Sequence, residues 1–444
     1  MKKILLLVLT AALLLSACAP AAVQNEFVLA VAEYPAMSPY PDEMSFVDEK
    51  TGVFDDEGFS VVFDAWLTDR KSQYDQPEGY ADTLTDYFLL SIPEFLEGEG
   101  NTVCSPLNIY MALAMLAEVT GGGSRQQILD LLGADSIEAL RTQAGYVWNA
   151  HYCADGGTAS VLANSLWLDE GLRYSADTVS TLAKDYFASV YQGDLGSGEM
   201  NKALQEWLDE QTGGLLEEQT QNVAMDPQTV LALASAIYYR VKWASEFSES
   251  RSTEGIFHAP GGDTEVTYMN TTLSYGPYYW GEGFAAAYLG LEDGGRMWLV
   301  LPDEGVTPGA LLESGTALDM ILGGSYEDQT AVQVNLSLPK FDITADTQLN
   351  EKLSALGVTE VFGGDADFTP ILPQDEAWLD SAQHAARVAI DEEGITAAAY
   401  TVMMACGASM PPEDEVDLIL DRPFLFVITS RDNLPLFAGV VNEP

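Results

Sequence analysis

A stretch near the C-terminus differs from the rest of the chain in the types of its residues, and this difference bears on function. The seventeen residues from 394 to 410 contain neither a charged residue nor a proline, although the whole chain carries a formal net charge of −49. Proline is excluded from central β-strands because it lacks a ladder donor, and a buried charge is costly. The composition is therefore compatible with a central β-strand.

Strand alternation supports this interpretation, because successive side chains point to opposite faces. The inward face would carry small or apolar residues, namely Ile395, Ala397, Ala399, Thr401, Met403 and Ala405. The outward face would carry Thr396, Ala398, Tyr400, Val402, Met404 and Cys406. Gly394 can supply a flexible hinge before this segment. The alternative, that residues 397–399 are part of a helix, stays open.

No catalytic or metal-binding motif is found elsewhere. The three histidines, His151, His258 and His384, lack metal-ligand spacing, and the chain has no Gly-x-Ser-x-Gly elbow. Cys104, Cys153 and Cys406 are too few for a disulfide framework, so we expect free thiols, with a single pair as the alternative. We therefore expect no enzyme activity, no cofactor and no metal. The acidic composition, with a pI near 4.1, also argues against nucleic-acid binding.

The N-terminus has the features of an export signal. Lys2 and Lys3 precede an apolar run from residue 4 to residue 15, which is short for a membrane span. The run ends in Leu15-Ser16-Ala17-Cys18, which resembles a bacterial lipoprotein cleavage box. That resemblance implies a signal peptide at 1–17, lipidation of Cys18 and attachment to the extracellular face of the membrane only through this lipid. The alternative is an ordinary secretory signal with a chance cysteine.

The rest of the chain predicts a spacer followed by one α+β domain. Residues 18–77 are rich in acid and proline, and we expect an acidic tether whose apolar run 59–63 pairs locally with the domain. Residues 78–444 form the domain. Helices are predicted at 81–96 (interrupted by Pro93), from Ser105-Pro106 onward, and at 124–132, 176–189, 202–211 and 347–356. Strands are predicted at 101–104, 160–168, 229–239, 297–301, 331–338 and 423–428.

Several motifs, in order along residues 80–444, together resemble the serpin family. They are the Ser105-Pro106 turn, Ala163-Asn164-Ser165-Leu166-Trp167, Trp207-Leu208 with Thr212-Gly213-Gly214, Lys242-Trp243, Leu338-Pro339-Lys340-Phe341, Asp421-Arg422-Pro423-Phe424 and Pro435-Leu436-Phe437-Ala438-Gly439. The resemblance implies a fold of three β-sheets and eight to nine helices, with an exposed reactive-centre loop above the central sheet.

The resemblance also assigns residues to a sheet-opening cluster. His384 lies ten residues before Gly394, where the family has the histidine that bridges the strands the loop must separate, and Ser105 and Asn108 match its usual partners. Trp243 matches the tryptophan under the top of the sheet. Ser235 stands where the family commonly has Asn, so the cluster would be rewired. A buried histidine with only local bonds and a plain core tryptophan are the alternatives.

The implied mechanism is suicide inhibition of serine proteases. The protease cleaves the loop, the freed segment inserts as a strand, and the enzyme stays attached as an acyl ester. The loop hinge would be Gly394, Ile395, Thr396, Ala397, Ala398 and Ala399, and counting fourteen residues from Gly394 places the cleaved bond at Ala408-Ser409. Alanine before that bond favours elastase-like or subtilisin-like partners. We expect a monomer; the alternative is a non-inhibitory serpin acting as a binding or structural module.

Overall fold

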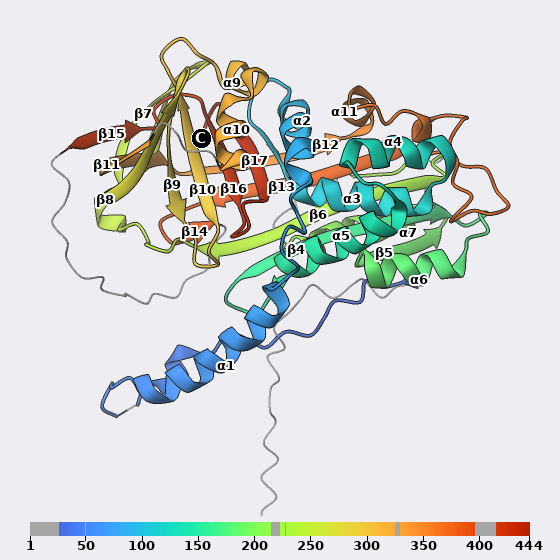
Figure 1. Cartoon of the computed structure of the whole chain (residues 1–444), viewed down its shortest axis with the longest axis horizontal. Coiled ribbons are helices and arrows are strands. Elements are labelled where there is room, and N and C mark those ends of the chain that lie inside the picture. Colours follow the sequence, from blue (N-terminus) through green and yellow to red (C-terminus); the bar gives the residue numbers. More distant parts are fainter. Residues whose placement is uncertain (1–25, 49, 215–222, 227, 325–328, 396–413) are drawn as a thin grey trace, which may run out of the picture.

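Helices pack around β-sheets throughout the chain (Figure 1). The computed structural model describes residues 26–48, 50–214, 223–226, 228–324, 329–395 and 414–444. Ten α-helices lie in these ranges, nine of them after residue 78, as the eight to nine helices of the sequence prediction require. The mixture of helices with long, mainly antiparallel strands confirms the predicted α+β class.

The N-terminal half contains most of the helices. Its elements are β1 (Val28–Ala30), α1 (Asp56–Tyr74), α2 (Leu84–Leu96), β2 (Thr102–Cys104), α3 (Pro106–Val119), α4 (Gly122–Leu132), α5 (Ile137–His151), β3 (Cys153–Ala154), β4 (Ala159–Asp169), α6 (Ala176–Asp185), β5 (Ala188–Gly193) and α7 (Gly198–Gln211). A short 3-10 helix, η1 (Glu43–Phe46), precedes α1.

The C-terminal half is mainly β-structure. Its elements are β6 (Leu231–Lys242), η2 (Glu249–Arg251), β7 (Thr253–Ala259), β8 (Gly262–Gly281), β9 (Phe284–Gly290), β10 (Arg296–Pro302), α9 (Pro308–Ser314), α10 (Thr316–Gly323), β11 (Gln329–Pro339), β12 (Phe341–Gln348), α11 (Asn350–Ala355), η3 (Glu360–Phe362), β13 (Ser381–Ile390), β14 (Gly394–Ile395), β15 (Glu415–Ile419), β16 (Phe424–Thr429) and β17 (Pro435–Val441).

The strands form two hydrogen-bonded sheets within the described residues. The first, here called the central sheet, has the order β1-β5-β4-β6-β14-β13-β12, with β3 paired to β4. The second has the order β15-β11-β8-β9-β10-β16-β17-β2, with β7 paired to β8. Three sheets were expected. The 20-residue strand β8 pairs with β7 near its start and with β9 at its end, so it joins the smaller sheets into one.

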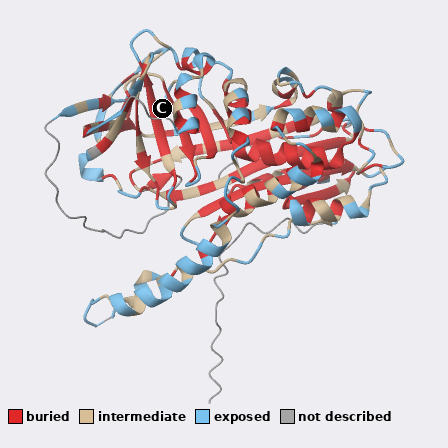
Figure 2. Cartoon of the chain, in the orientation of Figure 1, coloured by how far each residue is buried: buried red, intermediate tan, exposed pale blue. Residues whose placement is uncertain are grey.

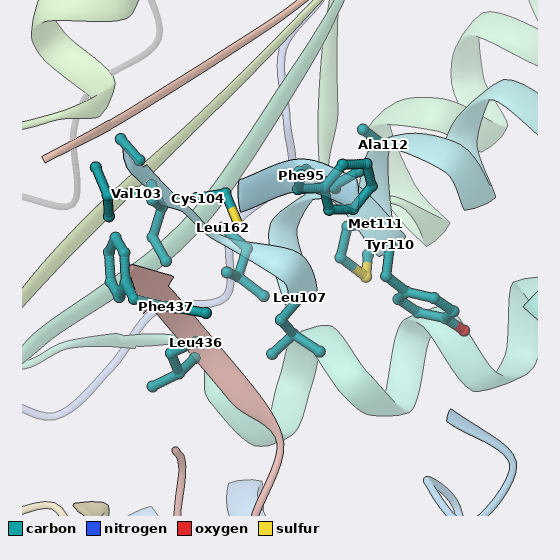
Figure 3. Packing of buried hydrophobic residues seen from close by; sticks show 14 of the residues in the cluster. Phe95, Val103, Cys104, Leu107, Tyr110, Met111, Ala112, Leu162, Leu436 and Phe437 are labelled. Carbon is teal, nitrogen blue, oxygen red and sulfur yellow. The ribbon is translucent and has the colours of Figure 1, made fainter. Parts of the chain in front are cut away.

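Helix α3 forms the centre of the core, and its start follows from two residues. The Ser105 hydroxyl accepts a hydrogen bond from the Asn108 N–H, and Pro106 occupies the first helical turn, as predicted. Every residue of α3 is buried. Figure 3 shows Leu107 of this helix near Leu162 of β4, and Met111 near Phe95 of α2. Buried residues continue along both sheets and the inner faces of the helices (Figure 2).

Some predicted elements are corrected by the structure. The helix predicted at 176–189 ends at Asp185, because the residues after Phe187 form the buried strand β5. Pro93 lies inside α2 and does not end it. Residues 347 and 348, predicted as helix, are the end of β12. The other predicted helices and strands are present, with bounds that shift by a few residues at most.

The segment predicted as a tether contains more regular structure than expected. Val28–Ala30 pairs with β5 at the edge of the central sheet. The run 59–63 is part of the 19-residue helix α1, which starts where the Asp55 carboxylate accepts a hydrogen bond from the Gly58 N–H. Much of α1 is exposed and projects from the body of the molecule (Figure 2). Among the described residues, no helix is both long and apolar enough to cross a membrane.

Candidate functional site: the loop hinge and its slot

The first residues of the neutral stretch already lie in the central sheet. Gly394 and Ile395 form the two-residue strand β14, which is antiparallel to both β6 and β13. Ile395 is opposite Val241 on one side and Ile390 on the other, and it is 1% exposed. The predicted hinge residues Gly394 and Ile395 are therefore placed at the entrance between two strands that the loop would have to separate.

Strands β6 and β13 pair with each other in their N-terminal halves, at the end away from the hinge. Their parallel pairing is limited to residues 232–236 of β6 and 381–385 of β13. Among the described residues, the intervening stretches 237–240 and 386–389 pair only on their outer sides, with β4 and β12. We call these two facing stretches the slot. A strand edge without a ladder partner can template the pairing of another strand.

The close approach of β14 to β6 explains the glycine at position 394. A Cβ on this residue would clash with the carbonyl oxygen of Val241 and would lie 2.7 Å from the Cα of Lys242. Any larger residue must therefore move the hinge out of the sheet.

The lower end of the slot is closed by a buried polar cluster around His384. His384 is opposite Ser235 in the register of β13 and β6, and its Nδ1 lies 3.3 Å from the Ser235 Oγ. Its Nε2 accepts a hydrogen bond from the Ser105 backbone N–H at 3.0 Å. The Asn108 amide donates to the Ser235 Oγ at 2.8 Å and to the Ala236 carbonyl at 2.6 Å. The structure thus brings the three predicted residues together, with Ser235 as the link.

The hydrogen bonds of His384 determine its tautomer. Because Nε2 accepts from a backbone N–H, the proton of the neutral ring is on Nδ1, which donates to Ser235. Burial lowers the pKa of His384 to about 3, because desolvation penalises the charged form of the ring. The ring is therefore neutral near pH 7 and serves as a hydrogen-bonding bridge between β6 and β13.

Trp243 lies at the opposite end of the slot and contacts the hinge rather than His384. Its indole Nε1 donates to the Asp391 carbonyl at 2.8 Å, and its backbone N–H donates to the Glu393 carbonyl at 3.0 Å. The Asp391 carboxylate in turn accepts from the N–H groups of Glu393 and Gly394. Trp243 and Asp391 together hold the turn from which β14 enters the sheet.

Glu392 is a residue of this turn that sequence reasoning did not identify as functional. Its carboxylate pairs with the Lys340 Nζ at 2.6 Å and accepts from the Ser252 Oγ at 2.7 Å. Burial works to raise the pKa of the Glu392 carboxyl, but the hydrogen bonds from Lys340 and Ser252 outweigh it, so the pKa lies below its ordinary value. Glu392 and Lys340 are far apart in sequence, and the only available signal was a carboxylate next to the neutral stretch.

The remaining predicted site residues lie outside the described residues. They are Cys18, Thr396, Ala397, Ala398, Ala399, Cys406, Ala408 and Ser409. Cys104 and Cys153 are described, and both are buried free thiols. Within the described residues there is no group of three or more His, Cys, Asp or Glu side chains that could hold a metal ion.

Comparisons with known proteins agree with this geometry. A family model described as serpin (serine protease inhibitor) matches residues 92–444. Serpin-ZX from Arabidopsis thaliana is 27% identical over 363 residues, which cover 78% of this chain and 92% of the relative. The leukocyte elastase inhibitor of Sus scrofa is 29% identical over 356 residues, covering 78% and 93%. The alpha-1-antiproteinase of Callosciurus caniceps is 28% identical over 399 residues, covering 87% and 94%.

Solved structures show the same fold. The native state of the thermophilic serpin tengpin superposes with a TM-score of 0.74 at 24% identity, covering 83% of this chain and 95% of that chain. The native stressed conformation of Arabidopsis AtSerpin1 gives a TM-score of 0.71 at 25% identity, covering 83% and 100%. The family match spans most of the sequence, and the fold and slot geometry accord with it: the chain belongs to the serpin family.

Proposed function

We propose that this serpin is a suicide inhibitor of elastase-like or subtilisin-like serine proteases, cleaved between Ala408 and Ser409. The observation that carries the proposal is the position of β14, which lies between β6 and β13 directly next to the slot. The neutral, proline-free sequence that follows Ile395 can continue this strand. Relatives named as an elastase inhibitor and an antiproteinase support the same class of partner.

The mechanism follows from the order of two events. The protease forms an acyl ester at Ala408, and the cut frees the segment that begins at Ile395. That segment extends β14 down the slot, and each net backbone hydrogen bond that it gains contributes about 0.5–1.5 kcal/mol. A dozen or more such bonds would supply on the order of 10 kcal/mol, which is enough to carry the attached enzyme to the far end of the sheet and distort its active site.

Incubation with an elastase and with subtilisin tests the proposal. We expect a covalent complex that survives SDS, together with a released C-terminal peptide that begins at Ser409 and is identified by mass spectrometry. Complete cleavage without a complex would instead favour the alternative, a non-inhibitory serpin that serves as a binding or structural module. Cleavage by a trypsin-like enzyme inside the loop is not expected, because residues 394–410 contain no Lys or Arg.

The proposed location of the inhibitor is the extracellular face of the cell membrane, with the lipid on Cys18 as its anchor. The support is the Leu15-Ser16-Ala17-Cys18 sequence behind a basic and apolar leader. A Cys18→Ser variant should move from the membrane fraction to the medium or remain unprocessed. Membrane retention of a processed Cys18→Ser variant would exclude lipidation at this residue.

A further inference from the structure

The residues before α1 hold both ends of another helix. We call residues 27–40 the strap. Its strand β1 pairs with β5, and the Gln192 N–H donates to the Phe27 carbonyl at 2.8 Å. At Gly193 a Cβ would lie 2.9 Å from both the Phe27 ring and the Met200 sulfur, so both side chains crowd this glycine. The strap therefore lies beside the first turn of α7 at the edge of the central sheet.

Tyr34 connects the strap to the other end of α7. Its hydroxyl donates to the Oε1 of Gln211, the last residue of α7, at 3.3 Å. Its ring packs on Trp148, with centroids 5.2 Å apart, and on Tyr152 at 5.5 Å. Trp148 belongs to α5, and Tyr152 follows this helix directly. Two more bonds fix the strap around Tyr34, from the Ala32 N–H to the Ser189 Oγ and from the Glu33 N–H to the Ala183 carbonyl.

The end of α7 lies where the sheet would have to open. Two residues after Gln211, Gly213 is pressed against Tyr238, since a Cβ there would lie 2.8 Å from the tyrosine ring. Tyr238 is one of the slot residues of β6 and is partly exposed, whereas its neighbours Ile237 and Tyr239 are buried. A strand entering beside residues 237–240 would place its outward side chains next to this contact. Full insertion therefore requires the end of α7 to move.

We propose that the strap is a brake on sheet opening, and that Tyr34 is the positioning residue through which it holds the C-terminal end of α7. This inference rests on the proposed function, because it concerns the speed of the loop insertion described there. By tying α7 to β5 and α5, the strap raises the cost of displacing α7 while it leaves the slot and the loop unchanged. It thus helps the uncleaved molecule to remain in its native state.

Hydrogen exchange of the intact, full-length protein tests the hold on α7 without any protease. Tyr34→Phe removes the bond to Gln211 and keeps the ring packing, so the peptide covering residues 198–213 should exchange roughly two- to twelve-fold faster, as expected for one hydrogen bond. Gln211→Leu should have the same effect. The double variant should add little to either single change, because both remove the same bond.

Tyr40→Phe is the matched control. It removes a tyrosine hydroxyl from the same segment, but that hydroxyl donates to Glu43 and not to α7. Exchange in α7 should be unchanged in this variant. Equal exchange in Tyr34→Phe and the wild type, or an equal increase in Tyr40→Phe, would overturn the role of Tyr34.

A second measurement separates the brake from the proposed function. On warming, the intact Tyr34→Phe protein should convert to the loop-inserted form, detected as lost inhibition with increased resistance to urea, two- to twelve-fold faster than the wild type. If α7 loosens but this rate does not change, the brake is refuted while protease trapping stands. If even the cleaved wild-type protein gains no stability, the proposed function fails first, and the brake fails with it.

Discussion

Two neighbouring residues of the hinge have distinct tasks. Gly394 permits the backbone of β14 to touch that of β6, whereas Ile395 places the first buried side chain of the new strand against the core. Glu392, two residues earlier, anchors the turn through Lys340 and Ser252. The ion pair thus fixes the turn before the hinge, and the strand β14 can be extended after Ile395.

A charge at Ile395 should convert the inhibitor into a substrate. Ile395→Arg puts a guanidinium at a position that is 1% exposed, where an unpaired charge costs several kcal/mol. The hinge then leaves the sheet, while the bond at Ala408 stays accessible. An SDS gel after elastase treatment should show the cleaved band and no complex. Ile395→Val, which keeps the apolar contact, should still trap the enzyme; trapping by the Arg variant would disprove entry of this residue.

Loss of the Glu392 charge should loosen the native hinge. Glu392→Gln keeps the shape of the side chain but removes the ion pair with Lys340, whose side chain is 38% exposed, so we expect a decrease of about 1 kcal/mol in the free energy of unfolding. Asp342→Asn is the control, because its pair with Arg387 has a similar distance but a more exposed carboxylate. Urea unfolding that shows equal losses in the two variants would contradict a special role for Glu392.

At the scale of elements, β6 and β13 are joined by a neutral histidine. The buried His384 has a pKa of about 3, against about 6.5 in the unfolded chain. Between these values the unfolded state binds more protons than the folded state, so stability increases with pH in this window and decreases as the medium becomes more acidic. Acidification therefore lowers the free energy of unfolding, while the ring in the folded sheet stays neutral down to about pH 3.

This pH dependence can be measured in a variant. Between pH 7.5 and pH 5, His384 should account for a loss of up to about 2 kcal/mol in the free energy of unfolding. His384→Gln should have a lower stability at pH 7.5 but a smaller loss on acidification. Some loss should persist, because burial also lowers the pKa of His151. If urea titrations give the same pH dependence of the free energy of unfolding for the variant and the wild type, His384 is not the group responsible.

Some helices and strands could be predicted from local sequence signals, and others could not. Local signals predicted α3, because a serine cap and a proline determine its start, and β4, because its apolar run is continuous. They failed for β5, where helical periodicity up to Asp185 runs into a buried strand, and for β1, whose three residues are a strand only because β5 offers an edge. The His384 cluster was predicted from the family pattern, but the Glu392–Lys340 pair joins distant residues through tertiary contact alone.

For the whole molecule, cleavage in the loop should increase stability rather than reduce it. An added strand of a dozen or more hydrogen bonds contributes on the order of 10 kcal/mol. For a domain of this size, that corresponds to an increase on the order of 10 °C in the midpoint of thermal unfolding. Calorimetry of the intact and the cleaved protein should show this increase. An unchanged or lower midpoint after cleavage would mean that the severed segment does not enter the sheet.

The register of β14 has a numerical consequence for the freed segment. Ile395 faces Val241 and Ile390, so a continuous strand would set residues 396–399 against the four positions on each side that pair with neither β6 nor β13 in the part of the chain that is described, and Tyr400 against Ala236 and Ala385. Four residues can thus advance without breaking a pair between β6 and β13. The fifth is the bulkiest of the segment, and it meets the first closed rung. We therefore expect the entry of residues 396–399 to be reversible, and the entry of Tyr400 to be the step that commits the segment to insertion.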